Sequence, residues 1–274
     1  MKFMDTSEDE SAKIHIFGVP FDSTSSFRSG SRFAPDEIRK FSYNLESYSP
    51  VLKKNLFDCD FIDRGDLELP FGNPSRAISE IADFTEKILS INAIPFALGG
   101  EHLITYGTFR AVTKKYPDVR LIQFDAHADL RDEYLGEKLS HATVIRRCAE
   151  LCGFENLIQI GVRSGTEEEW KTMEEIGSLT KTPDKFSKKI SKTNNIPIYL
   201  TVDLDILDPS VFPGTGTPEP GGLTYNELMA YLYKLRDLNI VGLDVVELSP
   251  PYDPSGISAA VASKIVRELL LIIS

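Results

Sequence analysis

The chain alternates short apolar runs with longer amphipathic segments, and this alternation limits the folds that it can adopt. Six apolar runs are typical of strands: residues 13–20, 94–100, 119–129, 156–164, 196–205 and 239–250, with a weaker candidate at 56–65. Helical patterns lie between them, at residues 75–91, 104–116, 142–154, 166–177, 224–238 and 258–273. Several strands are apolar on both faces, as in sheets that helices cover on both sides. The sequence therefore predicts an α/β protein, a three-layer α/β/α fold with a mainly parallel central sheet.

Length and composition suit one soluble domain. The 274 residues contain no internal repeat and no long linker, so we expect a single domain over residues 13–274. Residues 1–12 are acidic and lack the apolar region of a secretion signal. We therefore expect a flexible tail there, and not a targeting segment. No apolar run approaches the roughly 20 residues that span a bilayer. We therefore expect a cytoplasmic protein without a membrane partner.

Charge and cysteine content narrow the partners. The chain has 30 basic and 41 acidic residues, a net charge of −11. This balance argues against nucleic acid, which needs a basic face, and is compatible with a small cationic ligand. The three cysteines do not form an even disulfide framework, so free thiols in a reducing compartment are expected.

Acidic and imidazole side chains follow four of the predicted strands. The groups at these strand ends are His102, then Asp125, His127 and Asp129, then Asp203 and Asp205, and finally Glu247. In open parallel sheets, ligands bind outside the carboxyl ends of the strands. Two of the four histidines of the chain lie at these ends, and a third, His141, lies where a loop enters a predicted helix.

A metal site explains this concentration of charge. Buried carboxylates repel one another unless cations lie between them. Four aspartates and two histidines are too many ligands for one tetrahedral zinc. They suit two octahedral divalent ions, and mixed carboxylate and imidazole ligands favour manganese. Two such ions about 3.5–4 Å apart can activate a bridging water, so the chemistry indicated is metal-assisted hydrolysis.

Six motifs together resemble the ureohydrolase family, which includes arginases and agmatinases. They are GGEH (99–102), DAHAD (125–129), SHAT (140–143), TVDLDILDPS (201–210), PGTGTPEPGG (213–222) and ELSP (247–250). Their order and spacing cover the chain from about residue 15 to its end. The resemblance implies an arginase-like fold, two Mn²⁺ ions in each chain and a homo-oligomer, either a trimer or a hexamer.

The resemblance also implies roles for individual residues. One ion would bind His102, Asp125, Asp129 and Asp203, and the other would bind Asp125, His127, Asp203 and Asp205. Glu247 would hold the planar, charged guanidinium of the substrate. Asp129 would carry a proton to the departing amine. His141 would line the substrate pocket and exchange protons with solvent; its alternative role is helix capping.

The substrate implied is agmatine, cleaved to urea and putrescine in polyamine biosynthesis. Residues 24–39 resemble the agmatinase-type motif but depart from it at Ser29 and Ala34. Residues 130–133, Leu-Arg-Asp-Glu, stand where arginases carry an asparagine-containing loop. We expect this acidic loop to suit a substrate whose far end is an amine. Aminopropyl-agmatine fits equally well, whereas arginine and guanidinobutyrate fit less well; Arg131 is the one cation in the loop that could meet a carboxylate.

Three other classes remain as alternatives. A metal-dependent deacetylase on a related fold would use a single zinc, which six ligands do not favour. A phosphotransfer enzyme would read residues 203–207 as its catalytic loop, but no phosphate-binding glycine loop follows a strand. A non-enzymatic scaffold would have no need for so many carboxylates at strand ends.

Overall fold

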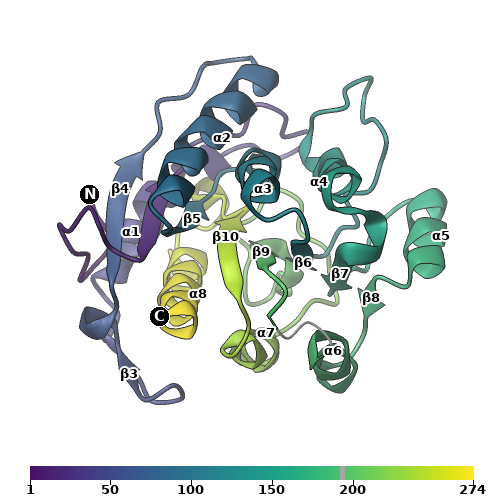
Figure 1. Ribbon diagram of the computed structural model, residues 1–274. Helices are drawn as coiled ribbons and strands as arrows, with labels where there is room; N and C mark the ends of the chain where they lie inside the picture. Colours follow the sequence, from purple (N-terminus) through teal and green to yellow (C-terminus); the bar gives the residue numbers. More distant parts are fainter. Residues whose placement is uncertain (192–194) are drawn as a thin grey trace.

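A central sheet of eight parallel strands organises the molecule (Figure 1). The structure is a computed structural model that describes residues 1–191 and 195–274. In spatial order the strands are β4 (Phe61–Asp66), β1 (Ile14–Gly18), β5 (Ile94–Leu98), β10 (Ile240–Val246), β9 (Ile198–Asp203), β6 (Arg120–Phe124), β7 (Leu157–Ile160) and β8 (Leu179–Thr180). Every neighbouring pair in this sheet is parallel, which confirms the predicted fold class.

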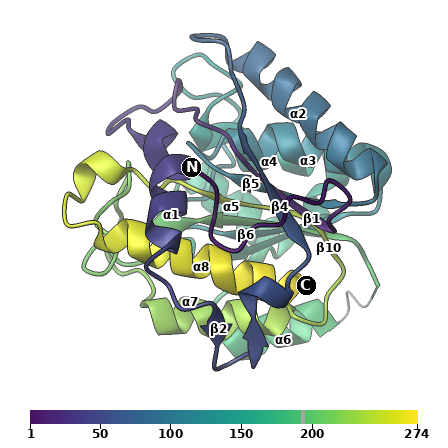
Figure 2. The same cartoon turned by 90° about the vertical axis from the view of Figure 1, so that its left-hand side faces the viewer.

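Helices cover both faces of the sheet (Figures 1 and 2). One layer contains α2 (Pro74–Ser90), α3 (Ile104–Lys115) and α4 (Val144–Cys152), with α5 (Glu167–Ile176) beside β8. The other contains α1 (Ala34–Ser42), α6 (Pro183–Ile190), α7 (Tyr225–Leu232) and α8 (Ile257–Ile273). Side chains of β5 alternate between the two cores: Phe96 and Leu98 join the α1/α8 side, and Ala97 joins the α2/α3 side. This period of two is what a strand buried on both faces requires.

Most predicted elements are present, and the omissions are short. The patterns did not predict α1, α6, β8 or the small antiparallel pair of β2 (Tyr48–Ser49) and β3 (Lys54–Asn55). The weaker strand candidate at residues 56–65 is a 3-10 turn, Leu56–Asp58, followed by β4. β2, β3 and β8 have only two residues each, and the apolar residues of α1 and α6 are too few to show a helical period.

The first twelve residues contact the outer strand β4. Phe3 is fully buried and packs edge-on against Phe61. The backbone N–H of Phe3 donates to Asp63 Oδ2 at 2.7 Å, and Ser7 N–H donates to the Phe61 carbonyl at 2.9 Å. These contacts attach the segment to the sheet, and its flexibility stays a prediction for hydrogen exchange to test.

The sheet order makes neighbours of the four strands that precede the predicted ligands. In chain order these strands are β5, β6, β9 and β10, but in space they stand as β5, β10, β9 and β6 at the centre of the sheet. Their carboxyl ends therefore open on one place. Within the described residues, no helix is both long and apolar enough to cross a membrane.

Candidate metal centre

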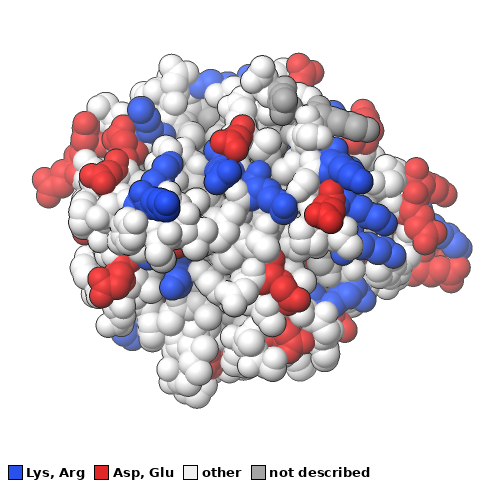
Figure 3. All heavy atoms as spheres, turned by 90° about the horizontal axis from the view of Figure 1, so that it is seen from below, with Lys and Arg blue, Asp and Glu red and all other residues white. Residues whose placement is uncertain are grey.

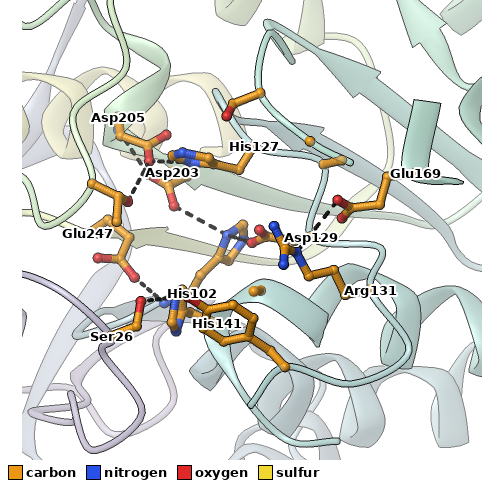
Figure 4. A pocket seen from close by; sticks show the side chains of 16 residues that line it. Ser26, His102, His127, Asp129, Arg131, His141, Glu169, Asp203, Asp205 and Glu247 are labelled. Carbon is orange, nitrogen blue, oxygen red and sulfur yellow. Dashed lines mark hydrogen bonds and ion pairs between the residues drawn. The ribbon is translucent and has the colours of Figure 1, made fainter. Parts of the chain in front are cut away.

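Three of the predicted carboxylate ligands surround one imidazole nitrogen of a fourth predicted ligand, His102. His102 lies just beyond β5, and its Nδ1 is 3.1 Å from Asp125 Oδ2. The same nitrogen lies 3.1 Å from Asp129 Oδ2 and 3.3 Å from Asp203 Oδ2. These contacts join residues that follow β5, β6 and β9, as Figure 4 shows for the labelled side chains.

The other two predicted ligands form the adjacent half of the site. His127 Nδ1 lies 2.8 Å from Asp205 Oδ2 and 3.7 Å from Asp125 Oδ1. The donor atoms of His102, Asp125 and Asp129 lie within 4.8 Å of one another, and so do those of Asp125, His127 and Asp205. Asp125 belongs to both groups. We call the six residues His102, Asp125, His127, Asp129, Asp203 and Asp205 the strand-end cluster.

The donor set fits divalent cations. His102 Nδ1 is buried and makes no hydrogen bond, although three carboxylates face it. Across residues 1–191 and 195–274, no lysine or arginine forms an ion pair with the four aspartates of the cluster. Oxygen and imidazole donors that converge without a neutralising side chain are suited to metal ions that prefer mixed N/O ligands.

Burial and the charges of neighbouring groups shift the pKa values of the side chains in this site. Burial, with the charge of Asp125, raises the pKa of Asp129 to about 7. Burial, with the charges of Glu101 and Asp205, raises the pKa of Glu247 to about 8. Burial lowers the pKa of His102, but the three carboxylates of Asp125, Asp129 and Asp203 that face its Nδ1 outweigh burial and raise that pKa. The site therefore holds protons at neutral pH unless other cations replace them.

Backbone strain is concentrated at the same edge. Asp129 and Glu247 both have positive φ angles, 53° and 67°, a region that residues other than glycine rarely adopt. Gly100 allows the chain to approach the β1 side closely, since a Cβ there would lie 1.9 Å from the Phe21 carbonyl oxygen. Such strain persists where surrounding contacts impose it, and it is common at functional sites.

A pocket of about 240 Å³ opens onto the cluster. Its lining includes Glu247, which is buried and whose Oε1 accepts a hydrogen bond from the His102 backbone N–H at 2.7 Å. His141 lines the same pocket; its Nε2 lies 3.2 Å from Ser26 Oγ, and its ring packs edge-on against Tyr134. Figure 4 shows these side chains around the cavity. The three residues predicted to contact substrate or carry protons thus share one pocket with the cluster.

Burial changes what His141 can do. It lowers the pKa of the ring to about 4, so the imidazole is neutral at physiological pH. Its backbone N–H donates to Thr24 Oγ1 at 3.2 Å. A neutral ring suits hydrogen bonding to a ligand better than proton exchange near pH 7.

The loop at residues 130–133 is arranged differently from the expectation. Only Arg131 of this loop lines the pocket. Asp132 points instead to Arg147, with Oδ1 2.8 Å from Nη2, and Glu133 is exposed. Neither acidic residue of the loop lines the pocket, because Arg147 on α4 binds Asp132 and Glu133 is exposed; that the loop suits an amine at the far end of the substrate stays a prediction.

Glu169 supplies the acidic group that the loop does not. It is buried at the start of α5, lines the pocket and lies 3.7 Å from Arg131 Nε. Its Oε1 accepts from Leu130 N–H at 2.8 Å, and its Oε2 accepts from Thr166 N–H at 2.7 Å. The sequence signal was the Thr166–Glu169 capping box, which marks a helix start but does not reveal that the same carboxylate reaches a cavity.

Two further positioning side chains were missed. Thr201 donates to the buried Asp244 at 2.6 Å, so its oxygen accepts from His102 Nε2 at 2.9 Å, which leaves Nδ1 facing the aspartates. Arg163 donates to the backbone carbonyls of Asp205 at 2.9 Å and Glu219 at 2.6 Å. Neither contact has a local sequence signal, since each joins segments far apart in the chain.

The outer surface gives no sign of a nucleic-acid partner on the face seen in Figure 3, where basic and acidic side chains are mixed. Binding to a phosphate backbone needs a continuous basic surface.

Comparison with known proteins gives a family for this arrangement. Residues 12–272 match the sequence model of the arginase family. The agmatinase of Bacillus subtilis (strain 168) is 45% identical over 269 residues, which cover 96% of this chain and 93% of the agmatinase. The guanidinobutyrase of Pseudomonas aeruginosa is 35% identical over 270 residues, which cover 93% of this chain and 85% of that protein.

A solved structure is similar to this chain in both fold and sequence. A protein from Clostridium difficile, described as a candidate agmatinase, superposes with a TM-score of 0.92 at 48% sequence identity. The match covers 96% of this chain and 97% of that one. The similarity to this solved structure thus extends over nearly the whole of both chains.

Proposed function

This chain belongs to the arginase family, whose members are metal-dependent hydrolases that act on guanidino groups, and we propose that it hydrolyses agmatine to urea and putrescine. Putrescine is a polyamine, so the reaction belongs to polyamine biosynthesis. The observation that carries this proposal is the strand-end cluster beneath a pocket that also contains the buried Glu247. The family match removes the reason for considering a deacetylase, a phosphotransfer enzyme or a scaffold.

The proposed cofactor is a pair of Mn²⁺ ions. One would bind His102, Asp125, Asp129 and Asp203, and the other would bind Asp125, His127, Asp203 and Asp205. The membership of Asp125 in both donor groups supports a bridging role for it. When bound, the ions would neutralise the carboxylates and make hydroxide available from water near neutral pH.

Glu247 is the proposed guanidinium holder. Its hydrogen bond from the His102 backbone fixes the carboxylate before substrate enters, and its burial strengthens pairing with a planar cation. Such pairing would direct the central carbon of the guanidinium toward the cluster. His141, neutral and beside Ser26, would complete the wall of the pocket as a hydrogen-bonding group.

Asp129 is the proposed proton carrier. The reaction breaks the bond between the guanidinium carbon and the chain nitrogen, places the oxygen of water in urea, and requires a proton on the departing amine. Asp129 lines the pocket, and a carboxylic acid there can give up a proton that it has taken from the attacking water.

The pocket mouth favours a substrate with an uncharged or cationic far end. Glu169 lies within 3.7 Å of Arg131 and compensates its charge, so Arg131 is a poor site for the carboxylate of guanidinobutyrate. Agmatine carries an ammonium there, and aminopropyl-agmatine carries a longer cationic tail. Both remain candidate substrates, and agmatine is preferred because of the 45% identical agmatinase.

A substrate panel tests the assignment. Purified protein loaded with Mn²⁺ should release urea from agmatine much faster than from arginine or guanidinobutyrate. Comparing aminopropyl-agmatine in the same assay separates the two polyamine precursors. Faster turnover of arginine would overturn the substrate proposal, and one zinc per chain with no manganese requirement would overturn the proposed cofactor.

We also propose that the protein is a homo-oligomer, a trimer or hexamer, and that it is cytoplasmic. Light scattering tests the oligomeric state, and cell fractionation tests the location.

A further inference from the structure

The chain contains only two glutamines, and the fold places them side by side inside the sheet. Gln123 on β6 and Gln159 on β7 are paired in register, and both are fully buried. A buried amide is costly unless its hydrogen-bonding groups find partners. Two amides at matching positions of neighbouring strands therefore call for an explanation that apolar packing does not give.

Their hydrogen bonds form a directed chain that ends on Asp125. Ser178, just before β8, donates from Oγ to Gln159 Oε1 at 2.6 Å. Gln159 donates from Nε2 to Gln123 Oε1 at 2.7 Å. Gln123 donates from Nε2 to Asp125 Oδ2 at 2.6 Å. Each link passes one donor toward the strand-end cluster, and the last is a charge-assisted hydrogen bond.

The surroundings fix which way each amide points. Gln123 Nε2 also donates to the His127 carbonyl at 3.2 Å, and Gln159 Nε2 also donates to the Ala128 carbonyl at 3.2 Å. Each NH₂ group thus has two acceptors, and turning either amide would set oxygen against oxygen. The chain of donors has one direction, and it also ties down the backbone between Asp125 and Asp129.

Both carboxylate oxygens of Asp125 are oriented as a result. Gln123 holds Oδ2, and the His127 backbone N–H donates to Oδ1 at 2.5 Å. Each oxygen has a second lone pair, and the two donor groups of the cluster share this residue. A carboxylate that accepts a hydrogen bond on each oxygen is restrained from rotating. Its remaining lone pairs therefore keep one direction.

We propose that Gln123, Gln159 and Ser178 form a positioning relay that orients Asp125 and thereby sets the affinity of the strand-end cluster for divalent cations. The inference rests on the proposed metal-dependent function and assigns a role to side chains that do not themselves touch the ions. Partners behind a metal ligand commonly change affinity by about 10–100-fold when they are removed.

The test is a calorimetric titration of the metal-free protein with Mn²⁺. Gln123→Met keeps the volume of the side chain and removes the donor, so the Kd for Mn²⁺ should rise at least about tenfold. Gln159→Met should have a smaller effect and Ser178→Ala the smallest, because each is one link farther from Asp125. Ser178→Ala is also the mildest change and keeps the series informative if a glutamine variant does not fold.

A matched control separates metal binding from packing. Leu121 lies two residues before Gln123 on β6 and is fully buried in an apolar environment. Leu121→Met should leave the Kd for Mn²⁺ unchanged, because a volume-conserving apolar change removes no donor.

The outcomes distinguish the two proposals. If the wild-type protein does not bind Mn²⁺, the proposed cofactor fails. If the wild type binds Mn²⁺ and Gln123→Met binds it equally well, the relay is wrong and the glutamines are structural. In that case the variants would lower the melting temperature of the metal-free protein while Kd stayed constant. A Kd that rises in the order Ser178→Ala, Gln159→Met, Gln123→Met supports the relay.

Discussion

Two buried clusters of charged side chains in the described part of the chain differ in what balances their carboxylates, and one of the two contains an arginine that does so. At the outer edge of the sheet, Arg39 pairs with Asp63 through Nε at 2.8 Å and Nη2 at 3.1 Å, and with Asp66 through Nη1 at 2.5 Å. We call these three residues the Arg39 cluster. The strand-end cluster instead gathers four aspartates around two histidines, with no lysine or arginine paired to them among the described residues.

Hydrogen bonding shows the same contrast. Each oxygen of Asp63 accepts two donors, one from Arg39 and one from the backbone N–H of Phe3 or Gly65. His102 Nδ1 in the strand-end cluster is buried and makes no hydrogen bond. A buried charge that is fully paired stabilises one structure, whereas incompletely paired charge is suited to binding. Both clusters are buried, so burial does not distinguish them. A structural ion cluster differs from a candidate binding site in that its charged atoms all have hydrogen-bond partners.

The largest expected effect comes from removing one carboxylate of the strand-end cluster. Asp205→Ala should reduce urea release by more than about 100-fold, beyond what changes behind a ligand typically cause. The free energy of unfolding of the metal-free protein should change much less than activity. Relief of repulsion between carboxylates is offset by loss of the acceptor of the Ala126 N–H at 3.1 Å and of the partner of His127 Nδ1 at 2.8 Å. Urea-release kinetics and denaturant titration measure both quantities. The control is Asp208→Asn, a turn residue nearby that should keep activity; full activity of Asp205→Ala would remove that residue from the ligand set.

The opposite result is expected in the Arg39 cluster. Arg39→Met leaves Asp63 buried without its cation and should lower the free energy of unfolding by about 3–5 kcal/mol. The activity of the folded fraction should not change, because these residues do not line the pocket. Denaturant titration with activity measured under native conditions checks both. The double variant Arg39→Met/Asp63→Leu should recover part of the loss, and a loss below about 1 kcal/mol would mean that the pair behaves like a surface ion pair.

The smallest effect is a pH dependence of the metal-free protein. Burial raises the pKa of Glu101 and of Asp129 to about 7, and that of Glu247 to about 8. An acid with a raised pKa keeps its proton in the fold after the unfolded chain has lost it, so stability falls as pH rises from the unfolded to the folded pKa. His141, whose pKa is about 4, acts in the other direction only below its unfolded value of 6.5.

Between pH 6.5 and 8 these contributions therefore have one sign. The free energy of unfolding of the metal-free protein should fall by about 3 kcal/mol over this range, which scanning calorimetry measures. Added Mn²⁺ should reverse the loss, because cations would take the place of the bound protons. A melting temperature that rises with pH in the absence of metal would contradict the assignment of protons to this site.

Most strands and helices could be predicted from the sequence alone, and so could the edge of the sheet on which the site lies. Apolar period and strand direction are local properties, so the residues after each strand could be assigned to the carboxyl edge before any pairing was known. That is why His102, Asp125, Asp203 and their neighbours were found together. β8 was missed because it has only two residues, and α6 was missed because Phe186 and Ile190 are its only apolar residues.

The sequence did not predict which strands are neighbours or which polar side chains face one another; these features are seen only in the tertiary structure. The placement of β10 between β5 and β9 brings Glu247 beside His102, and the register of β6 with β7 joins the two glutamines. It also turns Asp132 toward Arg147 and brings Glu169 to the pocket. Such contacts link segments that are distant along the chain. They depend on how whole sheets and helices pack against one another, and a local pattern of residues does not contain this information.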